Sequence, residues 1–324
     1  MATIEFGAGK ATTSLDAALT AAGAGGTVLS YGPHTDTKAG LTTWALNNVT
    51  WTHMGGGDYE FDGGLATLDC LKITGTGNTL NLLNADATRV KLTGYGRYVL
   101  WVTGTGNTIN DPYLIANGYV AASHCYHFVT NAAVTINRPV IASGLDNNAR
   151  HYCFYLNNCS GGIINDATID SVVATTANGR FYGAYANGTC GAVLFDGLTA
   201  TNSSGASTSA VLYYSGTGSG DVMVSRRIRT NAITSAGTCY GATANGRAID
   251  LQDFIFANSD GIGVYSSTPV SFAGGTNQIA NGVIYNMGGD GLYSNNTFAG
   301  STLTVRNVIS RDNAGDGFQS AGAL

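Results

Sequence analysis

Residues 72–81 read Lys-Ile-Thr-Gly-Thr-Gly-Asn-Thr-Leu-Asn, and residues 101–110 read Trp-Val-Thr-Gly-Thr-Gly-Asn-Thr-Ile-Asn, 29 positions later. The likeness weakens along the chain, but apolar residues keep recurring at nearly the same step. They are Ile109, Ile136, Ile164, Leu194, Met223, Leu251, Ile279 and Val305. A repeat period of roughly 20 to 50 residues predicts a solenoid or a propeller.

The contents of each repeat decide between these architectures. Short runs of Val, Ile, Leu, Phe and Tyr alternate with clusters of Gly, Asn, Ser and Thr, which leaves no room for a long helix. Leucine-rich, ankyrin and tetratricopeptide repeats need a helical leg, and propeller blades are nearer ~40 residues. Three short strands with three turns fit into about 27 residues at ~3.3 Å per residue. The sequence therefore predicts an all-β parallel β-helix of about nine to ten coils over residues 27–324.

Residues 1–26 are predicted to be an N-terminal segment with a short capping helix. Thr13 and Asp16 are spaced like the two members of a capping box, and Gly23 follows the helix as a stop signal. One predicted helical face is apolar and consists of Leu15, Ala18, Leu19 and Ala22. We expect this face to cover the core of the first coil.

The composition excludes several classes of protein. The chain has 324 residues with 46 glycines, and only 11% of its residues are charged, with a net charge of −5. Its few bases are scattered rather than striped, so no nucleic-acid partner is expected. No apolar run is long enough for a membrane span, and residues 1–7 do not look like a signal peptide. The six cysteines are therefore expected to be buried thiols of a protein folded in a reducing cytosol.

Several segments resemble the opening of pectate-lyase-like right-handed β-helices. They are Ser-Leu-Asp-Ala-Ala-Leu at 14–19, Ala-Gly-Ala-Gly-Gly-Thr-Val at 22–28, Gly-Leu-Thr at 40–42, Asn-Val-Thr at 48–50 and Gly-Gly-Gly at 55–57. The chain departs from the group at residues 29–34, where an apolar-Pro-Gly-Tyr turn is usual. The resemblance implies a right-handed coil. The group includes polysaccharide lyases, hydrolases and bacteriophage tailspikes, so it does not define one activity.

One candidate site is a column of aromatic residues at the ends of successive strands. Its members are Trp101, Phe128, Tyr155, Tyr185 and Tyr213. If the column faces outward, it can stack on the sugar rings of a surface polysaccharide or pack against another subunit. If it faces inward, it is a core ladder. The flanking residues are also apolar, so strand alternation does not decide between these alternatives.

A second candidate is an ionic column that follows the Ile-Asn steps. It consists of Asp111, Arg138, Asp166 and Asp196, with Arg226 as a possible continuation. Asp166 and Asp196 are the candidate acid and base for cleaving a glycosidic bond, and they are also candidate oxygen ligands of Ca²⁺. The resemblance to pectate lyases suggests Arg138 as the base of a lyase. The alternative is a structural column of salt bridges, in which like charges do not face each other.

Histidines and cysteines gather in two neighbouring coils, as His-Cys-Tyr-His at 124–127 and His-Tyr-Cys at 151–153. Cys125 and Cys153 are one repeat apart and are predicted to stack. The residue types suit zinc, but residues 124 and 127 point to opposite faces of a strand. We therefore predict buried thiols and no metal site.

Two functions are open at this stage. The first is a non-enzymatic structural protein of a bacteriophage virion, assembled in the host cytoplasm as a capsid decoration (cement) protein or a short spike. Residues 316–324 end in small and apolar residues, which predicts an open coil that docks on capsid or tail proteins. The resemblance to tailspikes implies a homotrimer. The second function is a polysaccharide lyase, a hydrolase or a phage depolymerase. A repeated turn, seen at 258–261, 287–291 and 314–317, marks the last coils.

Overall fold

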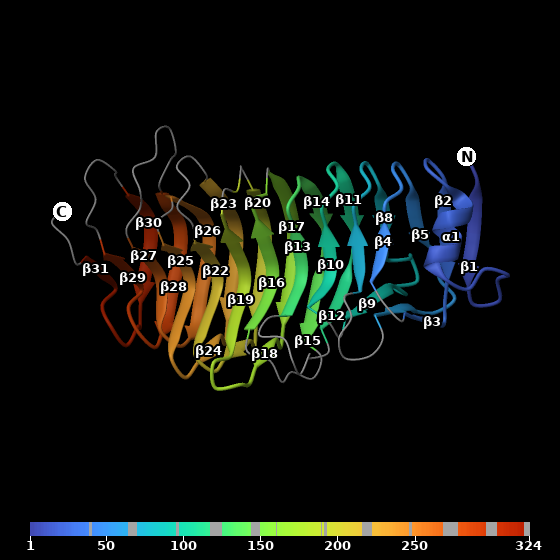
Figure 1. The fold of residues 1–324 in the computed structure, drawn as a ribbon. Coiled ribbons are helices and arrows are strands. Elements are labelled where there is room, and N and C mark those ends of the chain that lie inside the picture. Colours follow the sequence, from blue (N-terminus) through green and yellow to red (C-terminus); the bar gives the residue numbers. More distant parts are fainter. Residues whose placement is uncertain are drawn as a thin grey trace.

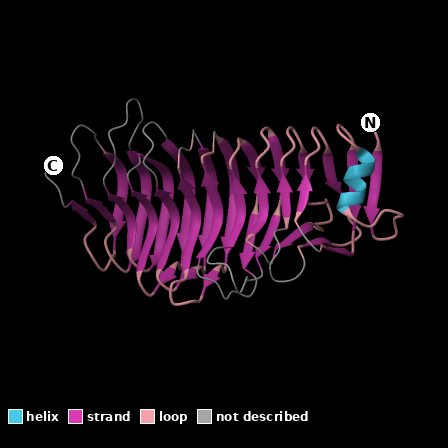
Figure 2. Ribbon diagram, viewed as in Figure 1, coloured by secondary structure: helices cyan, strands magenta, loops and turns pink. Residues whose placement is uncertain are grey.

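The computed structural model describes residues 1–38, 41–63, 70–94, 97–116, 125–143, 150–159, 161–188, 190, 193–215, 222–245, 248–267, 278–295 and 303–320. Strands stack along the whole length of a rod, with one helix at its N-terminal end (Figure 1, Figure 2). Within these ranges every pairing between named strands is parallel. The fold is the predicted right-handed parallel β-helix with a short capping helix.

The strands form three sheets. The first has eleven strands: β4 (Thr42–Trp44), β7 (Leu71–Ile73), β10 (Tyr98–Val102), β13 (Cys125–Thr130), β16 (Arg150–Asn157), β19 (Arg180–Asn187), β22 (Thr208–Ser215), β25 (Thr238–Asn245), β27 (Ile262–Ser267), β29 (Leu292–Asn295) and β31 (Phe318–Ser320). The smallest has three: β18 (Val173–Ala174), β21 (Ser204–Gly205) and β24 (Thr234–Ser235).

The largest sheet has seventeen strands. They are β1 (Thr3–Gly7), β2 (Thr27–Tyr31), β3 (His34–Thr37), β5 (Thr50–His53), β6 (Tyr59–Asp62), β8 (Thr79–Asn81), β9 (Val90–Gly94), β11 (Asn107–Asn110), β12 (Tyr113–Ala116), β14 (Val134–Asn137), β15 (Val140–Ser143), β17 (Gly162–Asp170), β20 (Val193–Thr201), β23 (Val222–Asn231), β26 (Ala248–Ser259), β28 (Gln278–Met287) and β30 (Thr304–Arg311). Two short strands per coil merge at β17, which pairs with both β14 and β15.

The capping helix α1 spans Leu15–Ala22, and its predicted apolar face is buried. Its N-cap is Ser14 and not the predicted Thr13, because the Ser14 side chain accepts a hydrogen bond from the backbone N–H of Ala17. Both residues carry a hydroxyl, so only the backbone geometry separates them. Gly23 has a φ of 67° and ends the helix as expected. In the described ranges, no helix is long and apolar enough to cross a membrane.

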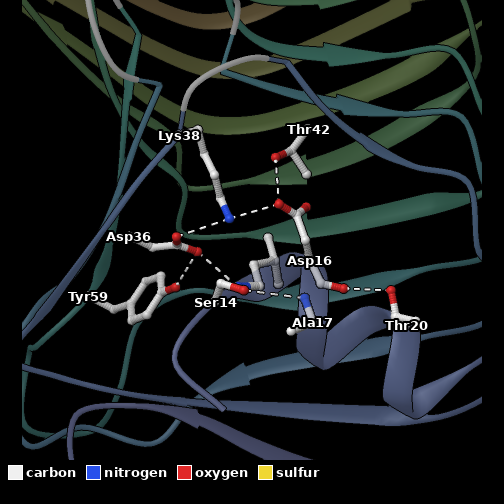
Figure 3. A network of polar contacts seen from close by, with 9 residues as sticks. Ser14, Asp16, Ala17, Thr20, Asp36, Lys38, Thr42 and Tyr59 are labelled. Carbon is white, nitrogen blue, oxygen red and sulfur yellow. Dashed lines mark hydrogen bonds and ion pairs between the residues drawn. The ribbon is translucent and has the colours of Figure 1, made fainter.

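A buried ionic network joins α1 to the first coils (Figure 3). The carboxylate of Asp36 accepts hydrogen bonds from the backbone N–H of Leu15 at 2.9 Å and from the Tyr59 hydroxyl at 3.0 Å. Lys38 Nζ lies 3.0 Å from Asp36 Oδ1 and 2.8 Å from Asp16 Oδ2. The side chains of Lys38 and Asp36 are only 10% and 7% exposed. Each buried charge is therefore compensated, and the cap is fixed over the first coil.

Replacing Lys38 tests this coupling. Lys38→Met leaves the Asp36 carboxylate buried beside the helix with no cation, so the free energy of unfolding should fall by about 3 kcal/mol in chemical denaturation. Lys10→Met is the matched control, because Lys10 pairs with Glu5 in solvent and should matter little. Equal stabilities of the two variants would contradict a role for the network.

Isoleucines stack in the predicted core column, with Ile109 paired to Ile136 and Ile136 to Ile164. The next partner is Phe195 and not the predicted Leu194, and after it comes Ser225 and not Met223. Leu194 and Met223 do not stand in the column because the coils that contain them differ in length from the earlier coils. The column then returns to Leu251, Ile279 and Val305 as predicted.

Asparagine side chains form a ladder at the corner that follows this core column. Asn110 Nδ2 donates to Asn81 Oδ1 at 2.8 Å, Asn137 Nδ2 to Asn110 Oδ1 at 2.7 Å, and Asn165 Nδ2 to Asn137 Oδ1 at 2.8 Å. An amide carries both a donor and an acceptor, so identical side chains satisfy each other when coils stack. The repeated asparagines of the sequence thus stabilise the stacking of coils.

Two histidines are buried inside the rod, in β13 and β16. His127 and His151 are both 0% exposed, and His127 Nε2 lies 3.2 Å from His151 Nδ1. Burial lowers the pKa of His127 well below its ordinary value, and the neighbouring His151 lowers it further. Cys125 pairs in register with His151 and not with Cys153 as predicted, because this coil is shorter than the predicted repeat. His124 lies outside the described residues.

The buried imidazole predicts acid lability. Below about pH 6.5 an unfolded histidine binds a proton that folded His127 excludes, so stability should fall with decreasing pH, by up to about 1.4 kcal/mol per pH unit for one group. Thermal unfolding midpoints of His127→Leu should fall less steeply between pH 7 and 5 than those of the wild type. His34→Leu, which removes a partly exposed histidine, should keep the wild-type slope. Parallel slopes for His127→Leu and wild type would contradict the assignment.

The other thiols agree with the sequence prediction. Cys70, Cys153, Cys159, Cys190 and Cys239 are free and buried. Burial raises the pKa of the Cys239 thiol to about 12. Such a thiol stays protonated and behaves as a small apolar side chain.

Candidate functional site

A second apolar cluster lies on the outer side of the eleven-stranded sheet, separate from the core. Its buried members are Tyr126, Val129, Tyr152, Tyr182 and Ala210, and the partly buried residues packed on them are Tyr98, Trp101, Tyr155, Tyr185, Tyr213 and Tyr240. Residues beside them in the same strands, such as Leu100, Phe154 and Leu212, belong to the core. We call this outer cluster the aromatic face.

Strand register arranges the aromatic face in two columns along the rod. The first column consists of Tyr98, Tyr126, Tyr152, Tyr182, Ala210 and Tyr240. The second consists of Trp101, Val129, Tyr155, Tyr185, Tyr213 and Thr243, and it continues to Tyr265 and Tyr293. The sequence singled out part of the second column and missed the first. The first column could have been found from the sequence, because in several coils an aromatic residue lies three positions before the residue of the second column.

Phe128 does not belong to the aromatic face, which corrects the predicted column. Trp101 pairs with Val129, while Phe128 pairs with Leu100 and Phe154 and is 0% exposed in the core. The coil here is one residue longer than the predicted offset, and a slip of one residue reverses the side of a strand. Trp101, Tyr155, Tyr185 and Tyr213 keep their predicted common column.

Rings within each column stack on one another. Ring centroids are 4.9 Å apart for Tyr126 and Tyr152 at an interplanar angle of 16°, and 5.1 Å apart for Tyr185 and Tyr213 at 6°. Between the columns the contacts are edge-to-face, as for Tyr182 and Tyr185 at 5.1 Å. Rings lying side by side in one plane cannot approach this closely, so the parallel rings overlap and cover part of each other's faces. Solvent therefore meets mainly ring edges and hydroxyl groups.

Burial keeps several phenol groups of the aromatic face protonated at neutral pH. Burial raises the pKa of Tyr126, Tyr182 and Tyr185, and it raises that of Tyr240 to about 12. A neutral phenol both donates and accepts a hydrogen bond. Tyr126, Tyr152 and Tyr182 are only 5%, 5% and 3% exposed, so most of the exposed surface of the aromatic face comes from the partly buried residues packed on them.

Four cations lie along the aromatic face, and we call them the basic edge: Lys72, Arg97, Arg150 and Arg180. Lys72 Nζ lies 3.9 Å from the ring centroid of Trp101, and Arg97 Cζ lies 5.3 Å from that of Tyr98. Arg180 Nη1 lies 3.5 Å from the hydroxyl oxygen of Tyr182. Arg150 and Arg180 are register partners in β16 and β19. Cation–π contacts and phenol oxygens thus hold the basic edge against the rings.

The predicted ionic column lies at the corner of the seventeen-stranded sheet. Arg138 makes two contacts with the Asp111 carboxylate, at 2.7 and 2.8 Å. Arg227 lies 3.0 Å from Asp166 Oδ1 and 2.5 Å from Asp196 Oδ1. Asp111 and Asp196 raise the pKa of Arg138 and Arg227, respectively, through these contacts. One arginine therefore serves both candidate catalytic aspartates.

Register corrects the predicted order of this column. Asp196 pairs with Asn165 and Arg226 pairs with Asp196, so both lie one position before the corner. The corner positions themselves have a positive φ: Asp111, Arg138, Asp166, Gly197 and Arg227. The side chains of Arg227 and Asp166 are 51% and 54% exposed, so the column lies on an open surface. Across the described residues, no group of three or more His, Cys, Asp or Glu is placed to hold a metal ion.

A hollow of about 440 Å³ lies along the corner of the last coils, where the repeated turn of the sequence occurs. Its walls include Asp260 and Asp312, among asparagine, serine and glycine. Asp260 Oδ2 accepts from the backbone N–H of Ser235 at 3.1 Å, and Asp312 pairs with Arg311 at 3.4 Å. The sequence marked the turn of Asp260 only as a repeat and did not single out Asp312, which the stacking of coils brings to the same hollow.

No family model and no curated protein matches this sequence. Among solved structures, the crystal structure of endo-xylogalacturonan hydrolase from Aspergillus tubingensis is similar over 99% of this chain and 92% of that chain. The TM-score is 0.43 and the sequence identity is 13%. At this TM-score and identity the likeness supports no statement about the activity of this chain.

The ring ladder predicts a stability contribution from the aromatic face. Tyr185 stacks on Tyr155 and Tyr213 and meets Tyr152 and Tyr182 edge-on. Tyr185→Ala should therefore lower the free energy of unfolding by about 2 kcal/mol. Tyr113→Ala, which truncates a partly exposed tyrosine of the other sheet, should cost clearly less in the same urea titration. Similar losses in both variants would contradict the ladder.

Proposed function

We propose that this protein is a non-enzymatic structural β-helix that acts as a decoration (cement) protein or a short spike of a bacteriophage particle. The observation that carries the non-enzymatic part is the shared ion pair of Arg227 with Asp166 and Asp196. A glycosidase needs two carboxyl groups that flank the scissile bond, one of them to donate a proton. Here both candidates bind the same arginine on an open corner.

The rest of this proposal concerns assembly. The coils stack into one straight rod (Figure 1), and the aromatic face gives it a long side on which another molecule can lie. Together with the resemblance of the N-terminal segments to phage β-helices, this supports a homotrimer that contacts capsid or tail proteins in the virion. Residues 321–324, on which the sequence prediction of an open docking end partly rested, lie outside the described residues.

Two measurements test the proposed assembly. Light scattering of the purified protein should show an oligomer at micromolar concentration, and electron microscopy of particles labelled with an antibody should place it on heads or tails. A stable monomer that is absent from particles would reject the proposal.

A second candidate function is that of a polysaccharide hydrolase, a lyase or a phage depolymerase. The observation that favours it is the hollow of the last coils, with Asp260 and Asp312 in its walls. If such an activity exists, Asp260→Asn with Asp312→Asn should abolish the release of new sugar ends. The Arg227 ion pairs make Asp166 and Asp196 the weaker pair for this role.

The two functions make opposite predictions for these four aspartates. For a structural protein, neither Asp166→Asn with Asp196→Asn nor Asp260→Asn with Asp312→Asn changes any glycan-cleaving signal, because wild-type protein has none above buffer. Reducing-end and unsaturated-product assays on acidic and neutral glycans measure this. Cleavage by the wild type that one pair of substitutions removes would establish the enzyme and its site.

A further inference from the structure

One face of the seventeen-stranded sheet is built from only two residue types. The strands β5, β8, β11 and β14 follow one another from the N-terminal end of the rod toward its middle (Figure 1). Their side chains alternate between the core and the outside. The outward residues are Thr50, Thr52, Thr79, Asn81, Thr108, Asn110, Thr135 and Asn137. This face therefore carries hydroxyl, methyl and amide groups and no charge.

Strand register places six threonines of this side in one column, which we call the threonine ladder. Its members are Thr3, Thr27, Thr50, Thr79, Thr108 and Thr135. The ladder ends at Ile163, the next register partner of Thr135. Parallel strands repeat at about 4.8 Å, so the hydroxyl groups of the ladder recur at that spacing along the rod.

The hydroxyl groups of the threonine ladder are rigidly placed and not used inside the protein. None of them forms a hydrogen bond with another group of the described residues. A β-branched side chain has few rotamers, which limits how far each hydroxyl can move. Beside the ladder, the amides of Asn81, Asn110 and Asn137 are joined by hydrogen bonds of 2.7–2.8 Å. The face is thus a fixed array whose hydroxyl groups are free to bond with water.

A hollow of about 270 Å³ adjoins the ladder at Thr135. Its other walls are Gly106, Ala133, Val134, Gly162 and Ile163. The space holds several water molecules, and apolar walls leave such water bonded mainly to other water. Hydroxyl anchors therefore stand beside an apolar recess in which water is held in an ordered arrangement.

We propose that the threonine ladder and the asparagines beside it bind the crystalline surface of water ice. The repeat of about 4.8 Å along the ladder is close to the repeat of oxygen atoms in hexagonal ice, so successive hydroxyl groups take lattice positions. The methyl groups fill the space between them. The lack of charge matters because an ammonium group keeps its own strong hydration shell, which does not fit the lattice. This activity is independent of the proposed function, because it uses another sheet than the aromatic face.

The residue types of this face favour ice over a macromolecule. Protein interfaces are enriched in aromatic residues, Met and Arg, and nucleic acids are held by Lys, Arg and open rings. The outward positions of β5, β8, β11 and β14 have none of these residues. A hydroxyl group both donates and accepts hydrogen bonds, as every water molecule of the lattice does.

Freezing experiments on the full chain test the inference. Wild-type protein should lower the freezing point of a single ice crystal below its melting point and should slow the recrystallisation of ice under a cold-stage microscope. Thr79→Lys with Thr135→Lys places two long charged side chains on the ladder and should abolish both effects. Thr43→Lys with Thr168→Lys is the matched control, because these exposed threonines lie outside the ladder, and it should keep both effects.

Circular dichroism melting checks that each variant is folded. Thr108→Tyr, which interrupts the ladder without adding charge, should also abolish both effects and serves if the lysines destabilise the protein. The inference is overturned if ice grows in wild-type protein as it does in serum albumin of equal concentration, or if both double variants lose the effects equally. A change of oligomeric state in the ladder variant alone, measured by light scattering, would assign the face to a second copy and also overturn it.

Discussion

The repeated vertical contact between coils is the constraint on which this structure depends. Parallel coils stack at one strand spacing, so each side chain lies directly over its equivalent in the next coil. The two side chains must therefore be able to pack or bond with each other without repulsion. Apolar residues meet this condition by packing into the core. Asparagines meet it by donating side-chain hydrogen bonds to one another along a ladder, and tyrosines meet it by stacking with their rings offset. In the ionic column, charges meet it because one cation reaches two anions, as Arg227 does. The low share of charged residues follows from this condition.

The same condition concentrates chemistry into lines along the rod. One corner of the seventeen-stranded sheet carries the ionic column, where Asp111, Arg138, Asp166 and Arg227 adopt a left-handed backbone conformation. The outer side of the eleven-stranded sheet carries the aromatic face with its basic edge. One hollow of about 440 Å³ lies at the turns of the last coils.

The N-terminal end and the body of the rod are stabilised by different interactions. At the N-terminal end, α1 covers the first coil, and buried Asp36 links it to Lys38 and Tyr59. Along the rod, stability is shared between neighbouring coils, as in other solenoids. The lowered pKa of buried His127 makes the packing sensitive to acid, and the raised pKa of phenols such as Tyr240 makes it sensitive to strong base.

The amino-acid sequence alone determined the architecture, because a regular short period, brief apolar runs and polar corners fit only a parallel β-helix. It also determined the buried face of the capping helix, since Leu15, Ala18, Leu19 and Ala22 follow helical spacing. Only the tertiary structure decided which side chains face outward. Coil lengths vary, and a shift of one residue exchanges inside for outside, which put Phe128 in the core and Val129 in its predicted place. Likewise, only the folded structure shows that Arg227 contacts both Asp166 and Asp196. Its long side chain reaches residues of other coils, and the spacing of these residues in the sequence does not reveal such a contact.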